Sequence, residues 1–132
     1  MLKGVEIYDL DPIDDKRGRF LKILKNENVD HSIFGEIYLV TILPNCSRGG
    51  HYHKKTTEWF FTIKGKGLLL LRNQNGERKS IKIGEKLFTV KVSPHVAHLI
   101  KNIGNEPLIL LAYADQPYCK ENPDTFPISI DE

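Results

Sequence analysis

The segment RGGHYHKKTTE, residues 48–58, concentrates side chains that can bind a metal or transfer a proton. Side chains two residues apart in a strand point to the same face, so His51 and His53 converge if a strand runs through them. Glu58 lies five residues after His53, which is the wrong parity for an unbroken strand. The intervening KKTT must turn or bulge to return Glu58 to that face. The segment could form a metal site, an acid–base site without metal, or a solvated basic turn.

A further imidazole, His98 in SPHVAHLIKN, is expected on a later strand that could pair beside this segment. Three imidazoles and one carboxylate suit zinc, iron, nickel or manganese, and we favour zinc. The predicted metal ligands are His51, His53, Glu58 and His98. In the metal-free alternative, His51 is a general base, because the pKa of free histidine is about 6.5. The two roles compete, because a histidine that binds a metal through one nitrogen is a poor general base.

The elements that must position these residues are short strands separated by turns. Residues 36–43, 59–73 and 79–83 are rich in β-branched, aromatic and alternating apolar residues, and residues 59–73 are expected to form two strands. NQNGE, residues 73–77, predicts a hairpin turn at its Asn-Gly step. No stretch of helical length shows a clear 3.6-residue period with caps. The pattern predicts an all-β sandwich or small barrel, large enough to hold one small ligand.

The composition bounds the other possibilities. The chain has 132 residues, 40% of them hydrophobic and 27% charged, which predicts a single globular domain over residues 1–132. The 19 basic and 17 acidic residues nearly balance, so no nucleic-acid partner is expected. Cys46 and Cys119 form neither a disulfide framework nor a zinc-finger pattern. No signal-peptide core or membrane span is evident, so we expect a cytoplasmic protein without a membrane partner.

The site residues also carry a family resemblance. GGHYHKKTTEWFFTIKG resembles the first cupin motif, G-H-x-H-x4-E-x6-G, through Gly50, His51, His53, Glu58 and Gly65. The second cupin motif, a proline–glycine turn followed by H-x3-N, is matched by Pro94, His98 and Asn102. The chain departs from this motif at His95, which stands where the glycine usually is. The resemblance implies a jelly-roll β-barrel of the cupin superfamily over most of the chain.

One branch of the cupins is indicated by the N-terminal segment DDKRGRFLKI, residues 14–23. It resembles the D-x-R-G-x-F opening of dTDP-4-dehydrorhamnose 3,5-epimerases, whose arginine contacts the phosphates of the nucleotide sugar. That role would fall on Arg17. The R-G-x-H segment of these enzymes resembles residues 48–51, which implies that Arg48 binds substrate and His51 is the catalytic base. Lys22 stands where that family has a glutamate on the substrate side. The resemblance therefore does not establish that the substrate is the rhamnose precursor itself.

Two further families match. The C-terminal cupin domain of capsular polysaccharide reductase-epimerases is similar in HYHKKTTE, PHVAHLIKNIG and ADQPYCKENPDTF. That domain carries a metal and acts on a keto intermediate of a UDP-linked acetamido sugar; this chain lacks the reductase half. The dTDP-4-keto-6-deoxyglucose 3,4-ketoisomerases share R-G-x-H-x-H-K and V-x-P-x-V-x-H, but they typically have a glutamine at the position of Glu58, which disfavours them.

All three families act beside a sugar ketone, which requires a base, a group that stabilises the enolate and an acid. His51 is the predicted base. Tyr113 or Tyr118 could return the proton, with Tyr38 less favoured, although each could simply pack in the barrel wall. Asp115 could orient a metal-free His51, as an acid does in the rhamnose epimerases. The predicted diphosphate contacts are Arg17, Arg48, Lys54 and Arg72, because guanidinium and ammonium groups suit phosphate oxygens.

The resemblance therefore implies an epimerase of a nucleotide-linked 4-keto-6-deoxy sugar in surface polysaccharide synthesis. Its partner would be a nucleotide-diphosphate sugar, and no nicotinamide or flavin is expected. The alternatives are a 3,4-ketoisomerase of a similar substrate and a non-catalytic metal- or sugar-binding cupin. We also expect a homodimer, because small jelly rolls leave sheet edges to cover.

Overall fold

The computed structural model describes residues 2–29 and 34–130 of the chain. Nearly all regular structure in these residues is antiparallel β-strand, and their one helical segment is a 3₁₀ turn, η1 (Asn26–Asn28). Within the described part of the chain, no helix has the length and apolar character needed to cross a lipid bilayer.

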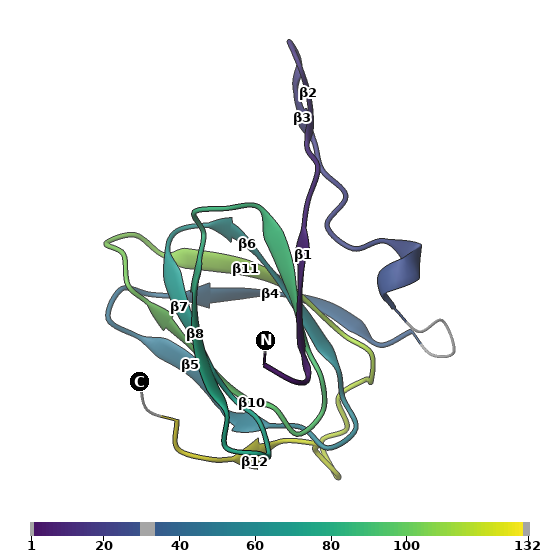
Figure 1. Ribbon diagram of the computed structural model, residues 1–132, viewed down its shortest axis with the longest axis vertical. Helices are drawn as coiled ribbons and strands as arrows, with labels where there is room; N and C mark the ends of the chain where they lie inside the picture. Colours follow the sequence, from purple (N-terminus) through teal and green to yellow (C-terminus); the bar gives the residue numbers. More distant parts are fainter. Residues whose placement is uncertain (1, 30–33, 131–132) are drawn as a thin grey trace.

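Two five-stranded sheets face each other across a shared interior (Figure 1). The first sheet has the order β1 (Val5–Asp9), β9 (Phe88–Val92), β6 (Glu58–Lys64), β11 (Leu108–Ala114) and β4 (Glu36–Ile42). The second sheet has the order β12 (Phe126–Pro127), β5 (Ser47–Tyr52), β10 (Ala97–Asn102), β7 (Gly67–Arg72) and β8 (Arg78–Ile83). This arrangement confirms the predicted all-β, jelly-roll architecture.

Alternate residues of the strands fill the interior between the sheets. Leu69 and Leu71 on β7, and Leu108 and Leu110 on β11, are each at most 1% exposed. Successive side chains of a strand point to opposite faces, so this spacing directs one face of each strand inward. Burial of one such leucine contributes about 1.5–3 kcal/mol. The core fixes the spacing of the two sheets, and with it the distances between site residues that different sheets contribute.

The turns follow the local sequence signals. The Oδ1 atom of Asn73 accepts hydrogen bonds from the backbone N–H groups of Asn75 and Glu77, both at 3.0 Å. Gly76 has a φ of 81°, a conformation that glycine adopts without strain. The predicted hairpin turn is thus confirmed between β7 and β8. The expected division of residues 59–73 into two strands is confirmed by β6 and β7.

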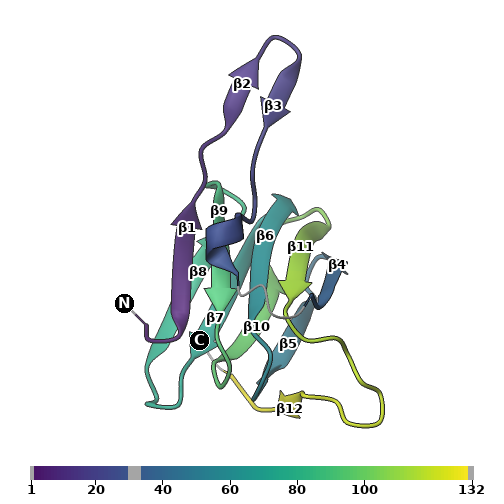
Figure 2. The same ribbon diagram turned by 90° about the vertical axis from the view of Figure 1, so that its right-hand side faces the viewer.

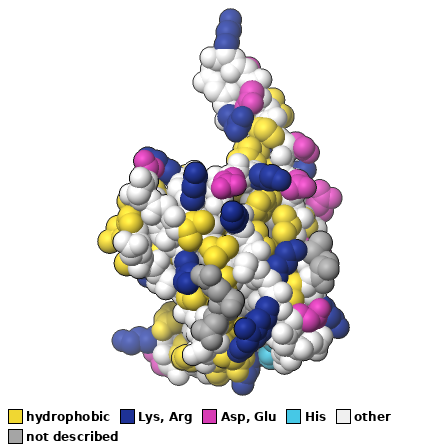
Figure 3. Space-filling model, turned by 60° about the vertical axis from the view of Figure 1, so that its left-hand side comes forward, with side chains coloured by type: hydrophobic (Ala, Val, Ile, Leu, Met, Phe, Trp, Pro, Cys, Tyr) yellow, Lys and Arg dark blue, Asp and Glu magenta, His cyan; other side chains and the backbone are white. Residues whose placement is uncertain are grey.

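A hairpin of β2 (Ile13–Asp15) and β3 (Gly18–Phe20) projects away from the barrel (Figures 1 and 2). Its two large apolar side chains, Ile13 and Phe20, are 65% and 59% exposed. Figure 3 shows hydrophobic side chains on this projection and on the body beneath it. The hairpin therefore presents apolar surface that the barrel of its own chain leaves uncovered.

Candidate active site

Strand pairing brings the four predicted metal ligands together. His51 on β5 lies directly opposite His98 on β10 in the register of the second sheet. Glu58 begins β6 in the first sheet and faces them across the interior. One ligand atom from each of these residues and from His53 lies within 4.8 Å of the others. We call these residues, His51, His53, Glu58 and His98, the His–Glu cluster; its three imidazoles and one carboxylate form a donor set that zinc accepts.

Backbone carbonyls orient two of the imidazoles. The Nδ1 atom of His53 lies against the carbonyl oxygen of Asp124, and that of His98 lies 3.3 Å from the carbonyl oxygen of Val96. A carbonyl only accepts, so each Nδ1 carries the proton. Each Nε2 then faces the Oε1 atom of Glu58, at 2.6 Å from His53 and 3.2 Å from His98. Histidines that bind metals commonly donate their second nitrogen in this way.

Tyr38 on β4 completes the surroundings of Glu58. Its hydroxyl donates a hydrogen bond to Oε2 of Glu58, the carboxylate oxygen that does not face the imidazoles. Burial, and next the charge of Glu58, raise the pKa of Tyr38 far above its ordinary value. Tyr38 therefore keeps its proton at neutral pH and is a hydrogen-bond donor inside the site.

Burial and neighbouring charges set the protonation of the cluster. Burial, together with the charges of His98 and His53, lowers the pKa of His51 to about 4. His51 is thus neutral at pH 7 and offers a lone pair to a metal or a proton. Burial opposes ionisation of Glu58, but hydrogen bonds and charge from His53 and His98 hold its pKa well below the ordinary value. Burial likewise lowers the pKa of His53, but its hydrogen bond to Glu58 outweighs this and raises it.

The KKTT segment turns as the parity of Glu58 requires, and Asp124 holds the turn. One carboxylate oxygen of Asp124 accepts the backbone N–H of Lys54 at 2.9 Å. The other accepts the N–H groups of Lys55 and Thr56 and the hydroxyl of Thr56, at 2.8, 3.0 and 2.9 Å. Sequence reasoning did not assign Asp124 to the site. Asp124 lies in ADQPYCKENPDTF, which resembles the capsular polysaccharide reductase-epimerases, but that resemblance gave it no role. The turn itself requires an acceptor without indicating where in the chain it lies.

The cluster lies between two pockets. The tail pocket, of about 520 Å³, is walled by residues 114–126 and has Lys54 and Tyr118 among its lining residues. The inter-sheet pocket, of about 570 Å³, is lined by residues of both sheets, including Arg48. Three side chains line both pockets: Tyr38, His51 and Glu58. A ligand in either pocket reaches the same chemical groups.

Two residues expected to act beside His51 lie elsewhere. The hydroxyl of Tyr113 accepts the N–H of Gly35 at 3.2 Å, and its ring packs on Trp59 at 5.4 Å between centroids. Tyr113 is only 9% exposed and lines neither pocket, so it serves the barrel wall. The carboxylate of Asp115 accepts the N–H of Thr57 at 2.9 Å rather than orienting His51. The structure thus gives each residue another partner, because strand pairing surrounds Tyr113 whereas Asp115 lies beyond the end of β11.

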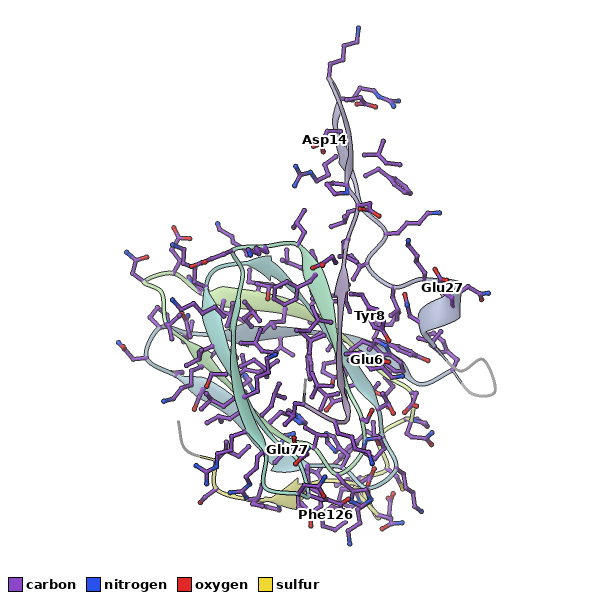
Figure 4. All side chains as sticks on the ribbon, in the orientation of Figure 1. Glu6, Tyr8, Asp14, Glu27, Glu77 and Phe126 are labelled. Atoms are coloured by element: carbon purple, nitrogen blue, oxygen red, sulfur yellow. The ribbon has the colours of Figure 1, made fainter. Side chains whose placement is uncertain are left out.

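Two of the four predicted phosphate contacts also lie away from the cluster. Arg17 is on the projecting hairpin, has an 86% exposed side chain and pairs with Asp15 at 2.7 Å. Figure 4 shows Asp14, on the same hairpin, at the opposite end of the molecule from Phe126, which lines the tail pocket. Within one chain Arg17 therefore cannot meet a ligand held by His51. Arg72 lines a separate groove on the outer face of the second sheet.

The remaining cations stay at the cluster, one in each pocket. The Nε atom of Arg48 donates to the carbonyl oxygen of Thr41 at 3.1 Å, which directs the guanidinium along the inter-sheet pocket. The ammonium group of Lys54 lies 4.2 Å from the ring centroid of Phe126 in the wall of the tail pocket. Tyr118, 67% exposed, stays at the tail pocket as expected.

Comparison with protein families supports the resemblance seen in the motifs. The sequence profile described as polysaccharide biosynthesis C-terminal domain matches residues 13–126. A curated relative, the UDP-2-acetamido-2,6-beta-L-arabino-hexul-4-ose reductase of Pseudomonas aeruginosa, is 33% identical over 127 residues. The match covers 95% of this chain but only 33% of that protein. The chain therefore spans about a third of the length of this relative.

Solved structures share the fold along most of the chain. A dTDP sugar isomerase from Desulfovibrio desulfuricans has a TM-score of 0.84 at 20% identity, covering 98% of this chain and 86% of its own. A doubly substituted 3,4-ketoisomerase from Thermoanaerobacterium thermosaccharolyticum, in complex with TDP, has a TM-score of 0.80 at 25% identity. That match covers 96% of this chain and 88% of the ketoisomerase. The predicted cupin-like barrel is thus confirmed.

Proposed function

Because the chain belongs to the polysaccharide biosynthesis C-terminal domain family, we propose that it is an isomerase of nucleoside diphosphate sugars. Its substrate is a 4-keto-6-deoxy sugar, and its leading reaction is epimerisation at a carbon next to the ketone, in the synthesis of capsule or O-antigen. The observation that carries this proposal is the shared wall of the two pockets. Neutral His51, ionised Glu58 and protonated Tyr38 lie there side by side.

These three groups supply the parts that enolate chemistry needs. In the metal-free site, neutral His51 accepts the proton next to the ketone. The hydroxyl of Tyr38 turns its single O–H from Glu58 to the substrate oxygen as negative charge develops there. Return of a proton to the opposite face inverts the carbon. Tyr118, at the rim of the tail pocket, is the proposed acid in place of Tyr113. Epimerisation needs no net change in the oxidation state of the sugar, so no nicotinamide or flavin is required.

The donor set of the His–Glu cluster also fits a divalent metal. His51, His53, Glu58 and His98 would hold it, with zinc favoured, and when bound it would polarise the ketone oxygen. His51 then no longer serves as base. Tyr38 and Tyr118 line the tail pocket outside the donor set, and we propose that one of them moves the proton.

The positions of Arg48 and Lys54 allow two placements of the substrate diphosphate. Arg48 lines only the inter-sheet pocket, and Lys54 lines the tail pocket, on the other side of the cluster. We place the sugar ring against His51 in either case. The nucleoside diphosphate then extends toward one of these two cations.

A 3,4-ketoisomerase is the second candidate, and one observation favours it. The TDP-bound ketoisomerase shares the fold over 96% of this chain at 25% identity. Both reactions begin with loss of a proton next to the ketone; they differ in the carbon that regains it. Ketoisomerases typically have glutamine at the position of Glu58, so we still favour epimerisation over ketoisomerisation.

Incubation with dTDP- and UDP-linked 4-keto-6-deoxy sugars in deuterated water separates the two reactions. Deuterium at C3 or C5 with the ketone retained at C4 supports epimerisation, whereas a ketone at C3 supports isomerisation. Absence of exchange with every such sugar would overturn both. If His51→Ala and the unchanged protein then bind nucleotide sugar equally and neither turns it over, the chain is a non-catalytic binding cupin.

We further propose a cytoplasmic homodimer of one domain per chain. Strand β4 is an edge strand, and its Ile37 and Leu39 are 60% and 66% exposed. Edge strands with exposed apolar residues favour association with a second copy. The projecting hairpin adds the exposed Ile13 and Phe20 to the surface available for pairing.

A further inference from the structure

We propose that Asp124 is the positioning residue of the metal centre: it presets His53 and Glu58 for a shared divalent cation. This inference rests on the proposed metal-binding role of the His–Glu cluster. Asp124 contacts the site in two ways. Its carboxylate holds the turn between these two ligands, and its backbone carbonyl accepts the Nδ1 proton of His53.

The turn needs such an acceptor because its backbone donors converge. Three successive N–H groups, those of Lys54, Lys55 and Thr56, point at one carboxylate. Successive N–H groups arranged in this way form a concave anion site. The charge of Asp124 is therefore matched to the turn rather than to the metal.

Both carboxylate oxygens of Asp124 accept hydrogen bonds, which the neutral side chain of asparagine cannot reproduce. Oδ1 accepts one hydrogen bond and Oδ2 accepts three. Asparagine offers a single acceptor oxygen, so Asp124→Asn must lose one of these groups of contacts. Alanine loses all four side-chain contacts. The two substitutions should therefore form a graded series.

Zinc binding by the purified full chain tests this role without any sugar substrate. We expect Asp124→Ala to weaken zinc about 10–100-fold, the usual effect of losing a partner that orients a ligand, and Asp124→Asn to weaken it less. The matched control is Asp115→Asn, whose carboxylate holds only the N–H of Thr57; we expect it to bind zinc as the unchanged protein does. Long-range ¹H–¹⁵N spectra of the zinc-bound protein give a second measurement, since the proton of His53 should sit on Nδ1, bonded to the carbonyl of Asp124, and that hydrogen bond should weaken in Asp124→Ala.

Affinities are measured well below each melting temperature, so that lost stability is not mistaken for lost positioning. Zinc binding by Asp124→Ala within threefold of the unchanged protein, or an unchanged protein that binds no zinc, would overturn the proposal. Intact zinc binding without isomerase turnover would instead count against the proposed reaction alone.

A different feature carries a second inference: we infer that the outer face of the second sheet binds a phosphorylated ligand. Tyr52 lies between His51 and His53 in the sequence, so its side chain points away from the cluster. It lines a groove of about 540 Å³ with Lys54, Arg72, Arg78 and His95. Among the residues that the structure describes, no acidic side chain lines this groove. We call it the outer groove.

Two unfavourable features meet in the outer groove. Arg72 and Arg78 are directly opposite each other in the β7–β8 register, and like charges so placed destabilise a sheet. Neither guanidinium has an ion pair or hydrogen bond with residues 2–29 or 34–130. His95 has a φ of 69°, in the left-handed region that glycine adopts most readily, at the position where cupin motifs usually have glycine. Its ring lies 6.3 Å from that of Tyr52.

A bound phosphoryl group would offset the first of these features. Two guanidinium groups match phosphate oxygens and would be relieved of their mutual repulsion by the bound charge. The rings of His95 and Tyr52 would border the ligand. The phosphate could belong to a nucleotide or to a free inorganic anion, because both present the same oxygens.

Titration of the full chain with inorganic pyrophosphate, followed by backbone amide NMR, tests the outer groove. We expect shifts at residues 73–78 and 95, and about a tenfold loss of affinity in Arg78→Ala, as for one lost charge-assisted hydrogen bond. The matched control is Lys82→Ala, an exposed cation of β8 outside the groove, which should bind normally. TDP in a parallel titration should bind more tightly if a nucleotide is the ligand. Absence of shifts in the groove, or an unchanged affinity in Arg78→Ala, would overturn the inference.

Discussion

The hydroxyl of Tyr38 donates a hydrogen bond to the buried carboxylate of Glu58, linking β4 to β6 across the intervening strand β11. This contact joins a protonated hydroxyl beside the His–Glu cluster to Glu58, the carboxylate that His53 and His98 already contact. Tyr38 thereby faces both pockets while its own pKa is raised by burial and by Glu58.

Tyr38→Phe should lower kcat of the proposed isomerase by about 10²–10³-fold, because it removes a hydrogen-bond donor from the position where negative charge develops. Zinc affinity should change much less, since Glu58 keeps its two imidazole contacts. The measurement is kcat with a nucleotide 4-keto sugar, beside zinc affinity of the same sample. Tyr113→Phe is the control, because that hydroxyl bonds Gly35 outside both pockets. Equal kcat values for Tyr38→Phe and the unchanged protein would contradict the role of Tyr38.

Removal of one cluster histidine should abolish tight zinc binding, whereas removal of a histidine outside the cluster should not. His53→Ala takes away a ligand whose second nitrogen is already oriented by Asp124. His95→Ala removes an imidazole of the outer groove. Metal content after dialysis should be close to one zinc per chain for the unchanged protein and for His95→Ala, and near zero for His53→Ala. Equal zinc content in both variants would rule out the predicted donor set.

The metal-free protein should lose stability in acid through Glu58. Burial opposes its ionisation, but His53 and His98 lower its folded-state pKa below the ordinary value of 4.5. A carboxyl group whose pKa is lowered by folding stabilises the protein fully above its unfolded pKa, and that contribution is lost as the pH falls through the folded pKa. Urea unfolding with a chelator present should thus show a free energy of unfolding that falls below about pH 4.5. Glu58→Gln should flatten this dependence; an unchanged slope would show that other groups cause it.

Arg48→Ala and Lys54→Ala should separate the two placements of the substrate diphosphate. Only the cation that contacts phosphate should matter, and its loss should weaken TDP binding about tenfold or more, because hydrogen bonds to charged groups are strong. Arg48 reports on the inter-sheet pocket. Lys54 lines both the tail pocket and the outer groove, so a loss in Lys54→Ala points to the tail pocket only where Arg78→Ala binds TDP normally. Calorimetric titration with TDP gives both affinities. Two unchanged affinities would exclude both pockets as the diphosphate site.

Leu39→Glu should convert the proposed dimer into a monomer, because it places a charge in the middle of the exposed apolar face of β4. The matched control is Ile103→Glu, which changes a 51% exposed isoleucine near the end of β10. Light scattering coupled to gel filtration should report a monomer for the first variant and a dimer for the second. If the unchanged protein has the molar mass of a single chain, the proposed dimer is wrong.

Local sequence determined much of this protein. The alternation of apolar residues specified the strands, and the Asn75–Gly76 step placed the hairpin, because both signals depend on neighbours in the chain. The spacing of His51 and His53 placed both imidazoles on one face for the same reason. Their convergence with Glu58 and His98 was expected from the cupin motifs and is present in the fold.

Other features depended on contacts between residues distant in the chain. The turn that returns Glu58 to the cluster is held by Asp124, about 70 residues away from it in sequence. Tyr113 and Asp115 flank one strand end, but strand pairing and loop packing set their surroundings. Arg17 and Arg72 carry the charge that phosphate requires, yet the direction of a hairpin and the outward face of β7 separate them from His51. Residue type and spacing thus determined which groups could act, whereas sheet register and packing, which join distant segments, decided which of them meet.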